Sequence, residues 1–371
     1  MKYLISGGGT GGHINPGLAI AKEIQNHEPD AEILFVGTKN GLESKLVPRE
    51  GYNIEYIEVS GFKRKLSMDT LKTATKLVKS FGSTRKIIKT FKPDVVIGTG
   101  GYVCGPVVFS AAMKKIPTVI HEQNAFPGVT NKILSHYVNA VAISFEDSRR
   151  RFKGKARITL TGNPVRSELF SQTKASAREK LQLSHDKPLV VIFGGSLGAE
   201  HLNQCVKDMI NLHYQDISYQ LILATGMKHY DAVMKEIKMP LPSHIRIEPY
   251  LYNMGDVLAS ADLAVCRGGA ITVSELAALG IPSILVPSPY VAENHQEHNA
   301  RALEQKGAAV VILQNQLTSE ILYGQIQKLI TNKDLRTKMS ADAKKIGIRN
   351  ASSSLYSLIK EIMREKPAKS K

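Results

Sequence analysis

The chain has 371 residues, 43% hydrophobic and 22% charged, which suits a globular protein with two domains rather than one. Lys and Arg outnumber Asp and Glu by 49 to 33, and this net charge of +16 favours an anionic partner. The three cysteines, Cys104, Cys205 and Cys266, lie far apart and form no C-x-x-C pair, which argues against a disulfide framework or a zinc site.

Short apolar segments rich in Val and Ile recur along the first half of the chain, separated by segments of helical period. This alternation is typical of β-α-β units with a buried parallel sheet. Residues 95–113 carry no charge and are long enough to cross a bilayer, but five Gly and Pro residues interrupt them, so they predict a strand, a glycine turn and a helix start. Strands are predicted at 2–6, 32–37, 94–98, 117–120, 140–144 and 157–161.

A second series of strands follows a polar stretch that begins after Thr161–Arg166, "TGNPVR". The expected fold class is therefore α/β, with two Rossmann-like domains whose parallel sheets face each other across a cleft. The expected domains are 1–164, 165–345 and a C-terminal amphipathic helix with a basic tail at 346–371, which we expect to pack back on the first domain. The strands of the second series are predicted at 189–193, 219–224, 245–249, 262–266, 283–286 and 308–313.

Glycine-rich turns follow three of these strands. Such turns let the backbone approach a ligand closely and point helix N-termini at it, so they predict anionic ligands. The first turn has the G-x-G-x-x-G spacing of a dinucleotide site, yet the next strand ends in Gly37 and Thr38 without the acidic residue that would bond a ribose. A nicotinamide dehydrogenase is therefore only an alternative. The turns are "GGGTGGH" (Gly7–His13), "GTGGYVCGP" (Gly98–Pro106) and "GGSLGA" (Gly194–Ala199).

The segment Cys266–Ala300 combines a strand end, a helix and a polar loop. Arg267 and the N-terminus of the helix that begins near Ala270 suit a diphosphate. Glu275, one turn into that helix, can accept two hydrogen bonds from sugar hydroxyls, although it could also be a solvated helix residue. No D-x-D pair occurs, so no metal and no other cofactor is expected, and helix dipoles and backbone amides would stabilise a departing nucleotide diphosphate.

Taken together, these motifs closely resemble those of the MurG family of peptidoglycan N-acetylglucosaminyltransferases. The resemblance implies a GT-B fold and an inverting transfer of GlcNAc from UDP-GlcNAc to the C4 hydroxyl of MurNAc in undecaprenyl-diphospho-MurNAc-pentapeptide, which converts lipid I to lipid II. It also implies a peripheral position on the cytoplasmic face of the cell membrane. The motifs, in order, are "GGGTGGHINP", "IGTGGYVCGP", "IHEQNAFPG", "LTGNPVR", "FGGSLGA", "CRGGAITVSELAALGIPSILVP" and "NHQEHNA".

The resemblance further implies roles for single residues. Ser196 would bond the diphosphate, Glu275 the ribose and Gln296 the GlcNAc hydroxyls, and the backbone at Leu251 would contact the uracil. The other donor-binding residues would be Thr10, Gly11, Gly12, Asn124, Arg166, Ala270, Ile271, Thr272, Val273 and Ser274, with Arg267 beside them. The acceptor would meet Gly101, Tyr102, His121 and Asn124.

His13 is the expected general base, because an imidazole changes protonation near neutral pH. Glu122 would orient His13 or serve as the base itself, and sequence does not separate these roles. The alternative for His13 is a residue that only caps its helix. Two further functions stay open: another lipid glycosyltransferase, of the diacylglycerol type, and a nucleotide-sugar-binding protein without catalysis.

Residues 62–92 carry ten Lys and Arg and one acid, Asp69, a net charge of +9 that is over half the excess of the chain. Apolar residues are interleaved with these charges. The stretch could be a solvated helix face or bind nucleic acid, but it has no recognised nucleic-acid motif. Docking on an anionic membrane surface is the favoured interpretation, because basic residues flanking apolar contacts bind such a surface.

Overall fold

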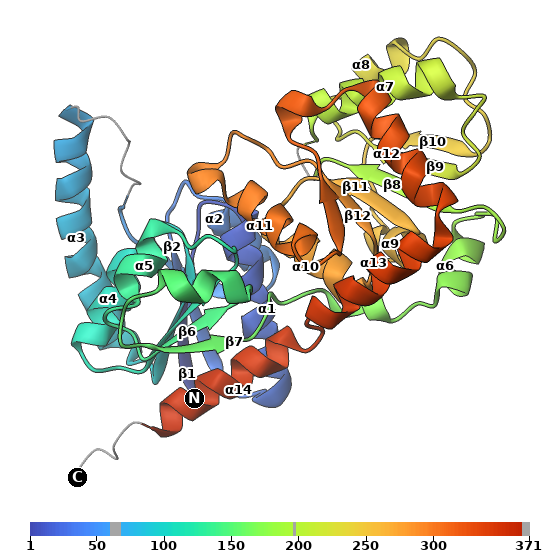
Figure 1. Ribbon diagram of the computed structural model, residues 1–371. Coiled ribbons are helices and arrows are strands. Elements are labelled where there is room, and N and C mark those ends of the chain that lie inside the picture. The colour runs from blue at the N-terminus through green and yellow to red at the C-terminus, as the bar shows by residue number, and fades with distance from the viewer. Residues whose placement is uncertain (60–67, 196–197, 366–371) are drawn as a thin grey trace. The chain divides into compact units, whose positions relative to one another are not determined.

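The computed structural model describes residues 1–59, 68–195 and 198–365, with the backbone alone for 68–74 and 167 (Figure 1). The chain divides into two compact units. The first contains Met1–Pro164 together with the segment that begins at Asn350, and the second is Val165–Arg349. The prediction of an α/β fold with two parallel sheets is confirmed, since each unit is built around one such sheet.

The first unit contains a seven-stranded sheet, as far as the described residues show, in the order β3-β2-β1-β4-β5-β6-β7. Every neighbouring pair is parallel, so all the carboxyl ends meet at one edge. Six of these strands are predicted from sequence. The seventh, β3, is short and alternates exposed with half-buried residues, so it lacks the apolar run that marks the others. The strands are β1 (Lys2–Gly7), β2 (Glu32–Gly37), β3 (Asn53–Tyr56), β4 (Val95–Gly100), β5 (Thr118–Glu122), β6 (Ala140–Ile143) and β7 (Arg157–Leu160).

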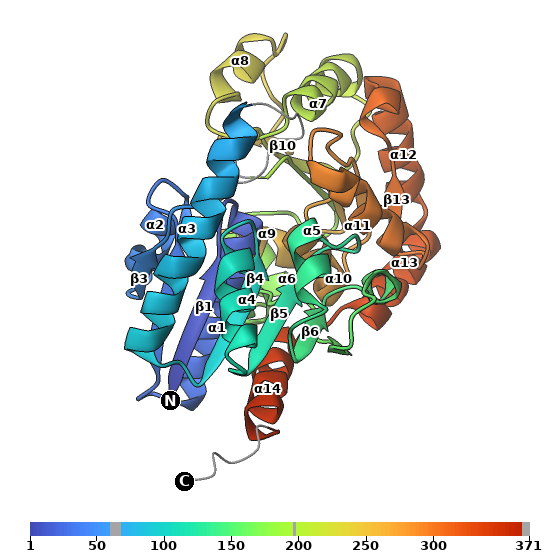
Figure 2. The ribbon, with the colours of Figure 1, turned by 90° about the vertical axis from the view of Figure 1, so that its left-hand side faces the viewer.

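Helices cover both faces of this sheet, because alternate residues of its central strands point to opposite sides. Tyr3 and Ile5 pack in one apolar layer with α1 and α14, whereas Leu4 packs in the other with α4 and α5. Figure 2 shows α3, α4 and α5 on the face turned toward the viewer. The helices are α1 (Gly11–His27), α2 (Glu43–Arg49), α3 (Met68–Phe91), α4 (Cys104–Met113), α5 (Val129–Leu134) and α14 (Ala351–Arg364).

The C-terminal helix α14 belongs to the first unit although it follows the second in sequence. Its apolar face buries Leu355, Ile359 and neighbouring residues against the layer that contains α1. Three donors from distant parts of the chain also converge on one carboxylate oxygen of Glu28: the hydroxyls of Tyr3 (2.7 Å) and Tyr356 (2.9 Å) and the Lys360 ammonium (2.7 Å). These hydrogen bonds lower the pKa of Glu28, although burial opposes them.

The second unit contains a six-stranded sheet in its described part, again parallel, in the order β10-β9-β8-β11-β12-β13. One face packs on α7 and α12. The strands are β8 (Leu189–Phe193), β9 (Gln220–Ala224), β10 (Ile245–Glu248), β11 (Leu263–Cys266), β12 (Ser283–Leu285) and β13 (Ala309–Val311). The helices are α6 (Lys174–Lys180), α7 (Glu200–His213), α8 (Tyr230–Lys235), α9 (Met254–Ser260), α10 (Ala270–Leu279), α11 (His295–Glu304), α12 (Ser319–Thr331) and α13 (Lys333–Ile346).

The segment 95–113, which is long enough to cross a bilayer, forms strand β4 and helix α4 with the glycine turn between them. Its strand is buried along its whole length in the centre of the first sheet. Across the described ranges 1–59, 68–195 and 198–365, no helix is both long enough and apolar enough to span a membrane.

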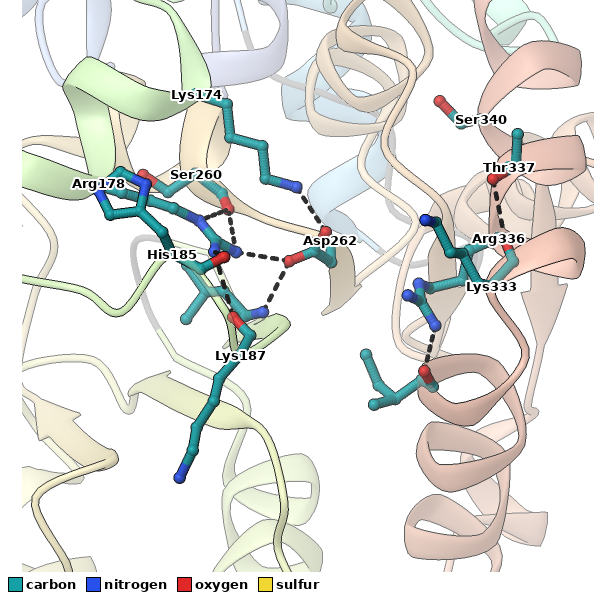
Figure 3. Close-up of polar contacts among 12 residues, drawn as sticks. Lys174, Arg178, His185, Lys187, Ser260, Asp262, Lys333, Arg336, Thr337 and Ser340 are labelled. Carbon is teal, nitrogen blue, oxygen red and sulfur yellow. Dashed lines mark hydrogen bonds and ion pairs between the residues drawn. The ribbon is translucent and has the colours of Figure 1, made fainter.

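A buried ion pair fastens α6 to the amino-terminal edge of the second sheet (Figure 3). Arg178 is 4% exposed, and its guanidinium donates to Asp262 Oδ2 at 2.7 Å. The same oxygen accepts the amide of Leu189 at 2.8 Å, where β8 begins. Arg178 also donates to backbone carbonyls, those of Ser184, His185, Lys187 and Ser260.

We expect Arg178→Met to destabilise the second unit by about 3–5 kcal/mol, because it removes the buried guanidinium together with its bond to Asp262 and its hydrogen bonds to several carbonyls. Guanidinium unfolding followed by far-UV circular dichroism measures this, since the chain has no Trp. Lys174→Met is the matched control. Lys174 pairs with the same carboxylate but its side chain is 47% exposed, so we expect a loss of at most about 1 kcal/mol. Equal losses in the two variants would contradict the prediction.

Candidate active site

Two glycine turns meet at the carboxyl edge of the first sheet, one after β1 and one after β4. The amide of Gly8 donates to the carbonyl of Gly100 at 3.3 Å. Gly100 and Gly101 have φ of 103° and 83°, and a Cβ on Gly101 would lie 2.4 Å from the Gly8 oxygen. Only glycine fits this backbone conformation and this approach. The two turns therefore form one surface at the edge where ligands of parallel sheets bind.

His13 lies on this surface, in the first turn of α1. Its Nδ1 is 3.1 Å from the carbonyl oxygen of Gly8 and 3.4 Å from the hydroxyl of Thr10. Because a carbonyl can only accept, this contact favours the neutral tautomer with the proton on Nδ1, in which Nε2 holds the free electron pair. The ring edge lies against Gly100, where a Cβ would come within 2.8 Å of Cδ2. His13 is half-buried, so the ring is held by the protein and still accessible.

The other residues predicted at this edge differ in how exposed they are. Thr10 and Gly12 are exposed at the start of α1, where Thr10 makes no side-chain cap, so the amide end of the helix is open. Gly11, Gly101 and Tyr102 are half-buried. The Tyr102 ring lies beside the first turn, 3.5 Å from the position of a Cβ on Gly9.

Glu122 is placed differently from His13. Its carboxylate is 2% exposed and ties the loop after β5 to α5. Oε1 accepts the backbone and side-chain amides of Asn124, at 3.0 and 3.2 Å, and Oε2 accepts the amide of Gly128 at 3.1 Å and the side chain of Asn131 at 2.8 Å. These hydrogen bonds hold the loop that contains Asn124 in one conformation. Asn124 itself is half-buried.

His121 is fully buried and faces the interior of the first unit. Its Nε2 lies 3.0 Å from the Gly162 carbonyl and 3.1 Å from the Ser144 hydroxyl, and Nδ1 lies 3.0 Å from Gln123 Nε2. Burial lowers the pKa of His121 to about 4. The side chain therefore joins the ends of three strands, and its contact with an acceptor stays a prediction.

One residue at this edge is absent from the sequence predictions. Glu43, the first residue of α2, is 1% exposed and accepts the amide of Gly9 through Oε2 at 3.0 Å. Its Oε1 accepts the amide and hydroxyl of Thr38, at 3.0 and 2.8 Å. The pattern "GTKNGLE", an acid that follows two closely spaced glycines at the end of a predicted strand, is the signal in the sequence that points to it.

The second unit brings Arg267, Gly268 and Gln296 together after β11. Arg267 donates to the carbonyl of Val286 at 3.0 Å, and burial lowers its pKa. Gln296 is half-buried and its Oε1 accepts the amide of Ser288 at 2.9 Å. A Cβ on Gly268 would lie 2.3 Å from the Gln296 carbonyl oxygen, so glycine is required for α11 to approach the turn.

Glu275 forms a two-pronged ion pair with Arg166. Arg166 Nε donates to Oε1 at 2.9 Å and Nη2 donates to Oε2 at 3.3 Å. Burial raises the pKa of Glu275, and the pair with Arg166 opposes that rise. The carboxylate is 6% exposed whereas the Arg166 side chain is 53% exposed. The two residues, separately predicted at the donor site, are thus in direct contact.

The remaining predicted donor residues differ in accessibility. Ala270, Ile271, Thr272 and Ser274 are half-buried in the first turns of α10, whereas Val273 and Leu251 are buried. Ser196 lies outside the described residues. Within the part of the chain that the structure describes, no group of three or more His, Cys, Asp and Glu side chains could hold a metal ion.

Two domain models of one family match most of the chain. Residues 3–143 match the glycosyltransferase family 28 N-terminal domain, and residues 189–361 match its C-terminal domain. The chain belongs to glycosyltransferase family 28.

Relatives and a solved structure agree with this assignment. The UDP-N-acetylglucosamine--N-acetylmuramyl-(pentapeptide) pyrophosphoryl-undecaprenol N-acetylglucosamine transferase of Acetivibrio thermocellus is 57% identical, covering 99% of this chain and 100% of the relative. The enzyme of the same name from Ruminiclostridium cellulolyticum is 54% identical, covering 98% and 100%. The crystal structure of Acinetobacter baumannii MurG has a TM-score of 0.80 at 30% identity, covering 97% of this chain and 99% of that one.

The contact between the two glycine turns can be tested with a matched pair of substitutions. Gly101 and Gly51 share a φ of 83°, but a Cβ on Gly51 meets nothing within 4 Å. Gly51→Ala should therefore cost only the backbone strain, about 1–2 kcal/mol. Gly101→Ala adds a clash with the Gly8 carbonyl, so we expect a clearly larger fall in the midpoint of thermal unfolding, measured by circular dichroism. Equal falls would show that the turns are not in close contact.

Proposed function

We propose that this glycosyltransferase transfers GlcNAc from UDP-GlcNAc to the C4 hydroxyl of MurNAc in undecaprenyl-diphospho-MurNAc-pentapeptide, forming lipid II from lipid I in peptidoglycan biosynthesis. The observation that carries the proposal is the 57% identity, over 99% of this chain, to a relative whose name states this donor and acceptor. The turn geometry around His13 and the Arg166–Glu275 pair support the proposal.

The second unit is the proposed donor-binding domain. Glu275 would accept the ribose hydroxyls, Gln296 would contact the GlcNAc hydroxyls, and Ser196 would bond the diphosphate. The N-terminus of α10 and the guanidinium of Arg267 favour the negative charge of a diphosphate. Arg166, paired with Glu275 in this structure, is exposed enough to turn toward the phosphates, and the ribose hydroxyls would then replace it on the carboxylate.

The first unit is the proposed acceptor domain, with His13 as the general base. Nε2 of the neutral imidazole takes the proton of the acceptor hydroxyl while the hydroxyl oxygen attacks the anomeric carbon. The bond from that carbon to the diphosphate oxygen breaks on the opposite side, and its electron pair leaves with UDP, which inverts the anomeric centre. Both carboxylate oxygens of Glu122 already accept hydrogen bonds, from four amide donors in all. This geometry favours His13 over Glu122 as the base.

The proposal predicts that radiolabelled GlcNAc passes from UDP-GlcNAc to a soluble lipid I analogue, and that EDTA does not slow the transfer. His13→Ala should lower the turnover number by roughly 10²–10⁴-fold, because the hydroxyl proton then has no acceptor. His136→Gln, a change at an exposed histidine of the same unit, is the control and should leave turnover unchanged. A His13→Ala loss under tenfold would reject His13 as base, and no transfer with bound UDP-GlcNAc would point to another lipid acceptor or a binding protein.

We further propose that the first unit docks on the anionic cytoplasmic face of the cell membrane through the basic stretch 62–92. In the described part of this stretch, the charged side chains of α3 and of Lys92, which follows it, are all exposed. The apolar side chain of Val78 lies between them and is 70% exposed. Phe81 stacks edge-on with Phe109, which stacks edge-on with Tyr137, so an aromatic row joins the helix to α4. Lys63, Arg64 and Lys65 lie outside the described residues. The exposed basic residues are Lys76, Lys79, Arg85, Lys86, Lys89 and Lys92.

Sedimentation with vesicles tests this docking. Binding should require anionic lipid and weaken with salt, and Lys76→Gln with Lys79→Gln should weaken it by about 2 kcal/mol, roughly 30-fold. The matched control is Lys235→Gln with Lys238→Gln, which removes two exposed charges from the second unit and should change binding little. Equal binding to neutral and anionic vesicles, unchanged by salt, would reject electrostatic docking.

A further inference from the structure

Glu43 contacts the turn that carries His13 through a single peptide group. The amide N–H of Gly9 donates to Glu43 Oε2 at 3.0 Å, and the carbonyl of Gly8 lies 3.1 Å from His13 Nδ1. These two atoms belong to the same peptide unit, which is trans, so its N–H and C=O point in opposite directions. The carboxylate and the imidazole therefore contact opposite ends of one peptide group, its N–H and its C=O.

The surroundings of Glu43 show that this contact is built into the fold. A Cβ would lie 2.6 Å from the Glu43 side chain at Gly8, 2.5 Å from it at Gly37 and 2.2 Å from it at Gly41. Three glycines thus leave the space that the carboxylate occupies. The carboxylate accepts all of these hydrogen bonds: one from the N–H of Gly9 and two from Thr38, through its N–H and its hydroxyl.

We propose that Glu43 is a positioning residue that acts on His13 through the Gly8–Gly9 peptide. A carboxylate that accepts from an amide N–H polarises that amide and makes its carbonyl oxygen a stronger acceptor. The stronger Gly8 carbonyl holds the proton on Nδ1 and so keeps the free electron pair on Nε2, the atom proposed to act as the base. The arrangement does the work that a carboxylate bonded directly to a histidine does in other enzymes, with one peptide group in between.

This inference rests on the proposed role of His13, but its first test does not depend on glycosyl transfer. Nitrogen NMR of the imidazole distinguishes the two neutral tautomers, with His13→Gln used to assign the signal. We expect the Nδ1–H tautomer to dominate in the wild-type protein. A dominant Nε2–H tautomer would overturn the inference without any variant and without any statement about activity.

Glu43→Gln is the decisive variant because it keeps the shape of the side chain. Its NH₂ group replaces one acceptor oxygen, so either Gly9 or Thr38 loses its hydrogen-bond acceptor, and the remaining oxygen is neutral. We expect a larger fraction of the Nε2–H tautomer and a fall in kcat on the order of tenfold, with KM for UDP-GlcNAc unchanged within about twofold.

Thr38→Val is the matched control. It removes the hydroxyl that bonds Glu43 Oε1 but leaves Gly9 bonded to Oε2. We expect it to lower the midpoint of thermal unfolding while the tautomer and kcat stay close to wild type. If both variants lower kcat equally, or if Glu43→Gln changes only stability, Glu43 is a structural residue and the inference is wrong. If the tautomer shifts as expected but His13→Ala retains turnover, the effect of Glu43 on the His13 tautomer is supported and the assignment of His13 as base fails.

Discussion

The close approach of two backbone turns, Gly7–His13 and Gly100–Tyr102, is the constraint on which the candidate site depends. Adjacent parallel strands place the two turns side by side, and the register pairs Gly7 with Gly100. The turns can touch only where no Cβ intervenes, and the ring of His13 then rests on the bare backbone of Gly100. A side chain at Gly100 would collide with the imidazole, so the position of the proposed base depends on backbone packing at this turn.

Carboxylates that accept backbone amides shape the loops of both units; Glu43 and Glu122 are buried, and the side chain of Asp262 is 19% exposed. Glu43, Glu122 and Asp262 each accept at least one backbone amide from a turn or a strand start. A carboxylate removed from water is costly unless it is paired or hydrogen-bonded, so each of these groups commits the surrounding backbone to one conformation. Glu275 differs, because its partner is the exposed side chain of Arg166 rather than a backbone amide. That partner can leave when a ligand arrives, which suits a residue proposed to bind ribose.

The sequence predicts the sheets well and the site only in part. Buried parallel strands are continuous apolar runs, so their places are evident from composition, whereas β3 has no such run and is missed. The glycine turns at strand ends are equally visible. The contact of Glu43 with Gly9 spans 34 residues, and the four donors to Glu122 include a side chain nine residues away, so neither follows from local pattern. Likewise, no spacing rule reveals that Arg166 holds Glu275 across 109 residues.

The return of α14 to the first unit has a consequence for synthesis of the chain. The sheet face that α14 covers, with Tyr3 and Ile5, is completed only after residues 350–364 have left the ribosome. At roughly 5–20 residues per second, translation of the 185 intervening residues (349 − 164) takes about 10–40 s. During that time the nascent first unit lacks the helix that covers this apolar layer in the folded protein. Chaperone engagement of the nascent chain should therefore persist until the last helix emerges, and a stalled or truncated product should aggregate.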